Sequence, residues 1–119
     1  MKITFDYEMD NVDVAYDELV AALGFASVAA DKLAKAKFDL DAARARTLAS
    51  GQVEAKNEAT REALLRELLA EKYQALALDE AQMRERRHAA EVAQLEVDRV
   101  RLRVRLMELA AGQAESASA

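Results

Sequence analysis

The chain has 119 residues, enough for one domain at most, and carries a net charge of −5. Alanine accounts for 27 of the residues, so the 52% apolar fraction predicts a thin core of helix-on-helix contacts. A charged fraction of 33%, three glycines and no proline are typical of long helices. The absence of cysteine excludes disulfides, thiolate metal sites and a cysteine nucleophile.

The charge is unevenly distributed along the chain. Residues 1–23 contain one basic and six acidic side chains, for a net charge of −5, whereas residues 84–106 have a net charge of +3. One end could therefore complement the other, within a chain or between chains, or the basic end could bind an anion. We favour complementation.

Nothing at the N-terminus is typical of a signal peptide, because acidic residues occur at every second position and no apolar segment follows. No apolar run approaches the roughly 20 residues that a membrane span requires. We therefore expect a soluble cytoplasmic protein without membrane partners.

Residues 2–10 alternate between apolar and polar side chains, which is the periodicity of a strand. A single strand is not stable alone. We therefore expect residues 1–10 to form a short extended acidic arm that lies on the helices or pairs with another copy.

The first helix is predicted over residues 12–49, with Asn11 or Asp13 as its N-cap. Apolar positions in this range alternate at spacings of three and four, as in a coiled coil with one polar interruption. The predicted seam consists of Tyr16, Leu19, Leu23, Ala26, Ala30, Leu33, Lys37 and Leu40.

A turn is predicted over residues 50–56, because Gly51 suits a helix C-terminus and Asn57 suits the N-cap of the next helix. The second helix is predicted over 57–111, and the short connection makes the two helices antiparallel neighbours. The predicted fold is all-α: a long, coiled-coil-like antiparallel hairpin. Asp79 could mark a break, although we favour continuity, and residues 112–119 are expected to be a disordered tail.

Residues 97–109 can be interpreted in two ways. The segment 99–106 alternates arginine with apolar residues, as a basic strand would, but its context favours helix. As a helix it is apolar on two nearly opposite sides, so it needs two partners. One side carries Leu95, Leu102, Leu106 and Leu109. The other side is our predicted oligomer interface, and it carries Val97, Val100, Val104 and Met107.

The motifs of common catalytic and metal sites are missing from the sequence. His88 is the only histidine and is expected to be solvated, and carboxylates such as Glu58 and Glu62 have the spacing of ordinary surface charges. We predict no enzyme activity, no cofactor and no metal. The candidate interaction or nucleic-acid-binding residues are Arg84, Arg86, Arg87, Arg99, Arg101, Arg103 and Arg105.

Residues 44–71, followed by a long helix rich in Ala, Leu, Arg and Glu, resemble a group of small phage and prophage helical proteins of unknown function. Their helix start, K-N-E-x-x-R-x-x-x-L, is matched by Lys56, Asn57, Glu58, Arg61 and Leu65. The resemblance implies an association with phage DNA metabolism in the host cytoplasm.

Three functions follow as expectations. The first is a non-enzymatic phage-type protein that forms a homo-oligomer, a dimer or higher, and acts by binding another macromolecule. The second is a DNA-binding accessory protein of phage recombination or replication that uses the arginine-rich helix. The third is an inhibitor of a host nucleic-acid enzyme, with the acidic N-terminal segment imitating phosphate.

Overall fold

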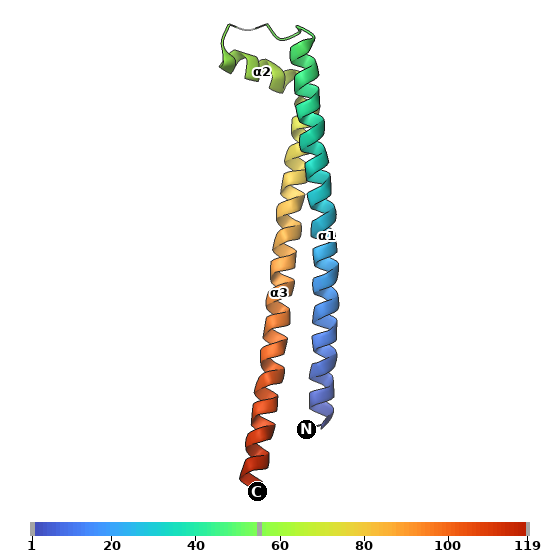
Figure 1. Cartoon of the computed structure of the whole chain (residues 1–119), viewed down its shortest axis with the longest axis vertical. Coiled ribbons are helices and arrows are strands. Elements are labelled where there is room, and N and C mark those ends of the chain that lie inside the picture. Colours follow the sequence, from blue (N-terminus) through green and yellow to red (C-terminus); the bar gives the residue numbers. More distant parts are fainter. Residues whose placement is uncertain (1, 55, 119) are drawn as a thin grey trace. The chain divides into compact units, whose positions relative to one another are not determined.

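The computed structural model describes residues 2–54 and 56–118, which form three helices: α1 (Lys2–Ala49), α2 (Glu58–Leu68) and α3 (Ala70–Ser118). The chain divides into two compact units, Met1–Phe25 with Arg86–Ala119, and Ala26–Glu85. We call them unit 1 and unit 2. In each unit a segment of α1 packs antiparallel against a segment of α3 (Figure 1). The predicted all-α, hairpin-like fold is confirmed.

The predicted extended arm is wrong, because residues 2–10 belong to α1; residue 1 lies outside the described residues. A lone strand finds no partner here, whereas a helix satisfies its own backbone hydrogen bonds. The helix also brings Glu8 and Val12 into line with Ala15 and Leu19, at spacings of four and three residues. Glu8 is buried and Val12 packs against the core.

The contact face of α1 is rich in alanine. Leu19, Leu33 and Leu40 of the predicted seam are buried or half-buried, but Tyr16 and Leu23 are exposed. Their expected places are taken by the preceding alanines, which recur every seven residues at positions 15, 22, 29, 36 and 43. Four of the eight predicted seam positions are therefore wrong, and in each case the residue that faces α3 is the alanine one position earlier. Small side chains face α3, and the bulky ones lie beside the contact.

The turn and its caps are confirmed for the residues that the structure describes, which leave out residue 55 of the predicted turn. Gly51 has φ +75°, a left-handed conformation that glycine adopts without the penalty of a side chain. Asn57 is the N-cap of α2, and its side-chain Oδ1 accepts a hydrogen bond of 2.8 Å from the backbone N–H of Thr60.

The second predicted helix is not continuous. It divides at Leu69 into α2 and α3, and the alternative break near Asp79 is also wrong because that residue lies inside α3. Figure 1 shows α2 lying crosswise to the start of α3. Leu65 of α2 is fully buried in unit 2, so tertiary packing determines this break.

The C-terminal part of α3 confirms one expectation and corrects another. Residues 99–106 are helical rather than a strand, as the favoured interpretation predicted. Residues 112–118 continue α3 instead of forming a disordered tail, and residue 119 of the predicted tail lies outside the described residues. Gly112 costs a helix only about 1 kcal/mol relative to alanine, and the residues around it are mostly good helix formers.

Candidate interaction surfaces

The predicted oligomer interface lies inside unit 1. Val97, Val100 and Val104 are buried and Met107 is half-buried. Val97 and Val100 form the core cluster together with Ala15 and Leu19 of α1. The assignment of the three valines to an oligomer interface is therefore wrong, whereas the assignment of Met107 stays a prediction. Two apolar stripes on α3 were recognisable from the sequence, but nothing in the pattern showed which of them faces α1.

The opposite stripe of α3 is the exposed one. Its positions are separated by three and four residues in alternation, which keeps them on one helix face. We define the outer seam as Val92, Leu95, Arg99, Leu102, Leu106 and Leu109. The exposed fractions of its five apolar residues run from 51% for Val92 to 67% for Leu95. The outer seam is thus a complete coiled-coil stripe without a partner in the described part of the chain.

Charged side chains flank the outer seam. On one flank Glu96 forms a bidentate pair with Arg99, with an Nη2–Oε1 distance of 2.7 Å. The hydrogen bonds from Arg99 lower the pKa of the Glu96 carboxyl below its usual range. On the other flank Asp98 accepts a hydrogen bond from Gln94, and Arg105 has no ion pair among the described residues.

One ion pair joins the acidic and basic ends of the chain. Arg103 Nη1 lies 3.4 Å from Glu8 Oε1, within unit 1. This pair agrees with the favoured interpretation, in which one end of the chain complements the other, and it does so within one chain. Asp10, Asp13 and Asp17 are exposed on the same helix.

The predicted arginine cluster at residues 84–87 does not act as one group. The guanidinium of Arg86 lies over the ring of Phe25, 4.7 Å from its centroid, in a cation–π contact. Arg84 and Arg87 are exposed and form no ion pair among the described residues, and His88 is exposed as expected.

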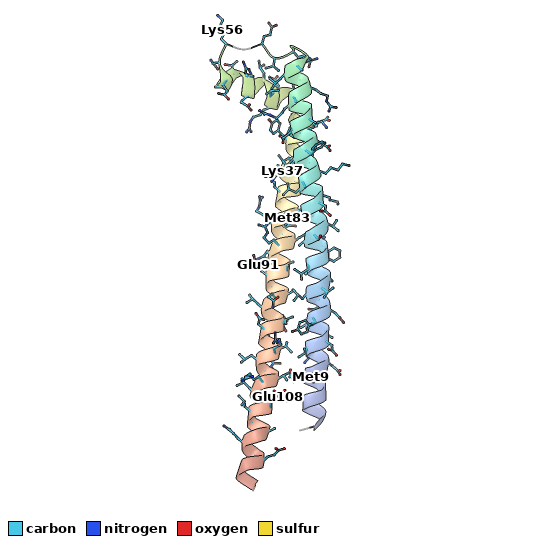
Figure 2. The ribbon with its side chains drawn as sticks, viewed as in Figure 1. Met9, Lys37, Lys56, Met83, Glu91 and Glu108 are labelled. Carbon is cyan, nitrogen blue, oxygen red and sulfur yellow. The ribbon has the colours of Figure 1, made fainter. Side chains whose placement is uncertain are left out.

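Arg101 and Arg105 line an open groove of about 500 Å³ in unit 1, together with Met9 and Val12 of α1. Met9 and Glu108, which face this groove from α1 and α3, are labelled in Figure 2. Like Arg105, Arg101 has no ion pair within residues 2–54 and 56–118. The groove therefore combines an apolar wall with two available guanidinium groups.

Unit 2 contains a polar cluster that the sequence pattern does not predict. Arg44 of α1 donates two hydrogen bonds to Glu62 of α2, at 2.9 and 2.5 Å, and another to the hydroxyl of Tyr73 of α3. These contacts lower the pKa of Glu62 and raise that of Arg44. The guanidinium of Arg66 lies 5.2 Å from the centroid of the Tyr73 ring. The cluster joins all three helices, and only the position of Arg44 on the inner side of α1 could have indicated it.

Among the residues that the structure describes, no group of three or more histidine, cysteine or acidic side chains could hold a metal ion. None of the described helices is long and apolar enough to cross a membrane.

No family model, curated protein or solved structure matches the chain. The resemblance of residues 44–71 and the long helix that follows them to phage proteins therefore stays a prediction.

Proposed function

We propose that the chain is a non-enzymatic, phage-type helical protein that oligomerises and acts by binding another macromolecule. The outer seam of α3 is the observation that supports this function. Its five apolar side chains are more than half exposed, although the opposite face of the same helix is already buried against α1. A contiguous exposed apolar stripe on a helix is typical of a surface that binds protein.

Further exposed apolar residues lie on the N-terminal part of α1. Met9, Tyr16 and Leu23 recur every seven residues and are 40%, 39% and 52% exposed. They lie beside the α1–α3 contact, where Met9 also lines the groove. A molecule that oligomerises through α3 would retain this second apolar surface for a different macromolecule.

Light scattering on the purified chain tests the proposed oligomerisation. We expect a mass at micromolar concentration that is at least twice the 13.1 kDa of one chain. Replacing Leu102 with glutamate should lower the mass, whereas replacing the exposed Leu78, which lies outside the outer seam, should leave it unchanged. A native chain that stays monomeric would contradict the proposal.

A second candidate is a DNA-binding accessory protein of phage recombination or replication. It is favoured by four of the seven candidate arginines, which are exposed and have neither an ion pair nor a cation–π contact among the described residues: Arg84, Arg87, Arg101 and Arg105. Unpaired guanidinium groups are available for phosphate contacts, whereas Arg99 and Arg103 have carboxylate partners.

Fluorescence anisotropy with labelled single- and double-stranded DNA tests this candidate. Binding should weaken steeply between about 50 and 200 mM salt, because phosphate contacts release counterions. The double variant Arg101→Ala and Arg105→Ala should bind more weakly than the charge-matched control Lys35→Ala and Lys37→Ala. Absence of binding at low salt, or equal loss in both variants, would exclude this role for the two arginines.

A further inference from the structure

We propose that two copies of the chain pair antiparallel through the outer seams of their α3 helices. This inference rests on the proposed function, because it specifies the partner and geometry of the oligomer proposed above. The outer seam is interrupted by a single polar residue, Arg99, and α1 already holds the helix in place from the opposite side. The helix is therefore already formed before two copies associate, so association does not have to offset the conformational entropy lost on forming it.

The order of residues in the seam favours the antiparallel direction. The six positions are distributed symmetrically about the point between Val100 and Arg101. An antiparallel copy therefore places Val92 against Leu109 of the second copy and Leu95 against Leu106. Arg99 faces Leu102 of the second copy, so its guanidinium can extend past the seam into water. In a parallel pair, by contrast, the two Arg99 side chains would face each other across the seam.

The flanking charges favour the same direction. In an antiparallel pair, Asp98 lies opposite Arg105 of the second copy, and Glu96 lies opposite Arg103. Each of these complementary pairs occurs twice by symmetry. In a parallel pair only one flank pair would be complementary, Asp98 with Arg103 of the second copy. Glu91 would lie opposite Glu96 of the second copy, and Arg105 opposite the uncharged Ala110. Opposite charges at these positions determine partner choice and orientation in coiled coils.

Asp98 and Arg105 are the flanking residues best placed to form a new contact. Neither has an ion pair among the described residues, and Asp98 accepts only the hydrogen bond from Gln94. On the other flank, Glu96 and Arg103 already have partners within the chain. Arg103 uses one nitrogen toward Glu8, which leaves other donors of its guanidinium available. The Asp98–Arg105 contact is therefore the one that is tested most directly by exchanging the acidic and the basic side chain between these two positions.

A charge exchange followed by sedimentation equilibrium tests the pairing. Asp98→Arg and Arg105→Asp, each alone, should raise the dimer dissociation constant by about three- to tenfold, because each places like charges opposite one another. The double variant should restore the native dimer dissociation constant, because opposite charges again lie opposite one another. In a parallel dimer it would not, since residues 98 and 105 would not meet.

Disulfide trapping tests the direction independently, because the native chain has no cysteine. An equimolar mixture of the Leu95→Cys and Leu106→Cys variants should yield mainly the mixed disulfide, because these positions face each other in the antiparallel pair. The matched control is the Leu95→Cys variant alone, which should cross-link poorly. Circular dichroism of each variant checks that the helices are intact.

The outcomes separate this inference from the proposed function. Restoration by the double variant together with preferential mixed cross-linking supports the antiparallel pair. Efficient cross-linking of the Leu95→Cys variant to itself would overturn the direction while leaving oligomerisation intact. Oligomers that persist unchanged when Leu102 and Leu106 are replaced by glutamate would overturn the interface but not the proposed function. A native chain that is monomeric would overturn both.

Discussion

At the scale of single residues, Glu8 is the least favourable member of the unit 1 contact. Its exposed fraction is 7%, and its Oε2 atom is buried without a hydrogen-bond partner among the described residues. The other oxygen has only the long 3.4 Å contact with Arg103, which is itself 47% exposed. Burying a carboxylate costs free energy that one such contact offsets only in part.

Replacing Glu8 with leucine should therefore stabilise the fold by about 1 kcal/mol, because an apolar side chain continues the inner face of α1 and Arg103 remains hydrated. Urea denaturation followed by circular dichroism measures the change. The control is Asp10→Leu, at an exposed position, which should change the free energy of unfolding by less than about 0.5 kcal/mol. A loss of stability in Glu8→Leu would show that the ion pair is worth more than its burial costs.

At the scale of helices, sequence periodicity predicted the existence of the elements better than their ends and faces. The turn at Gly51 and the cap at Asn57 were predictable because each depends on the local chemistry of one residue. The break at Leu69 has no such local cause, since neither glycine nor proline lies nearby. It depends on the burial of Leu65 and on the contact of Arg44 with Glu62, residues that come together only after folding.

The faces of the helices show a second limit of sequence reasoning. The alternation of Ala15 and Leu19 fits a coiled coil as well as the alternation of Tyr16 and Leu19 does, and larger side chains suggest a larger core. Close contact between α1 and α3 instead selects the smaller residue. The same ambiguity led us to assign the stripe of Val97 rather than that of Leu102 to the oligomer interface. An apolar stripe thus indicates that a partner exists, but not which one.

At the scale of the whole molecule, stability should depend on pH through one carboxylate in each unit. The pKa values of Glu62 in unit 2 and Glu96 in unit 1 are lowered, mainly by hydrogen bonds from Arg44 and Arg99 respectively. The unfolded chain loses these bonds, so in acid it binds more protons than the folded chain does. The contribution of both groups is therefore complete above their ordinary pKa of about 4.5 and is lost as pH falls through the lowered values.

We expect the thermal unfolding midpoint to change little between about pH 7 and pH 5.5, and then to fall as the pH is lowered toward 3. Circular dichroism at a fixed chain concentration measures this profile. The double variant Glu62→Gln and Glu96→Gln should be less stable than the native chain at pH 7 and should lose less stability on acidification. Because both carboxylates are partly exposed, added salt should reduce the difference. A double variant that lost as much stability as the native chain between pH 5 and pH 3 would contradict the stabilising role of both pairs.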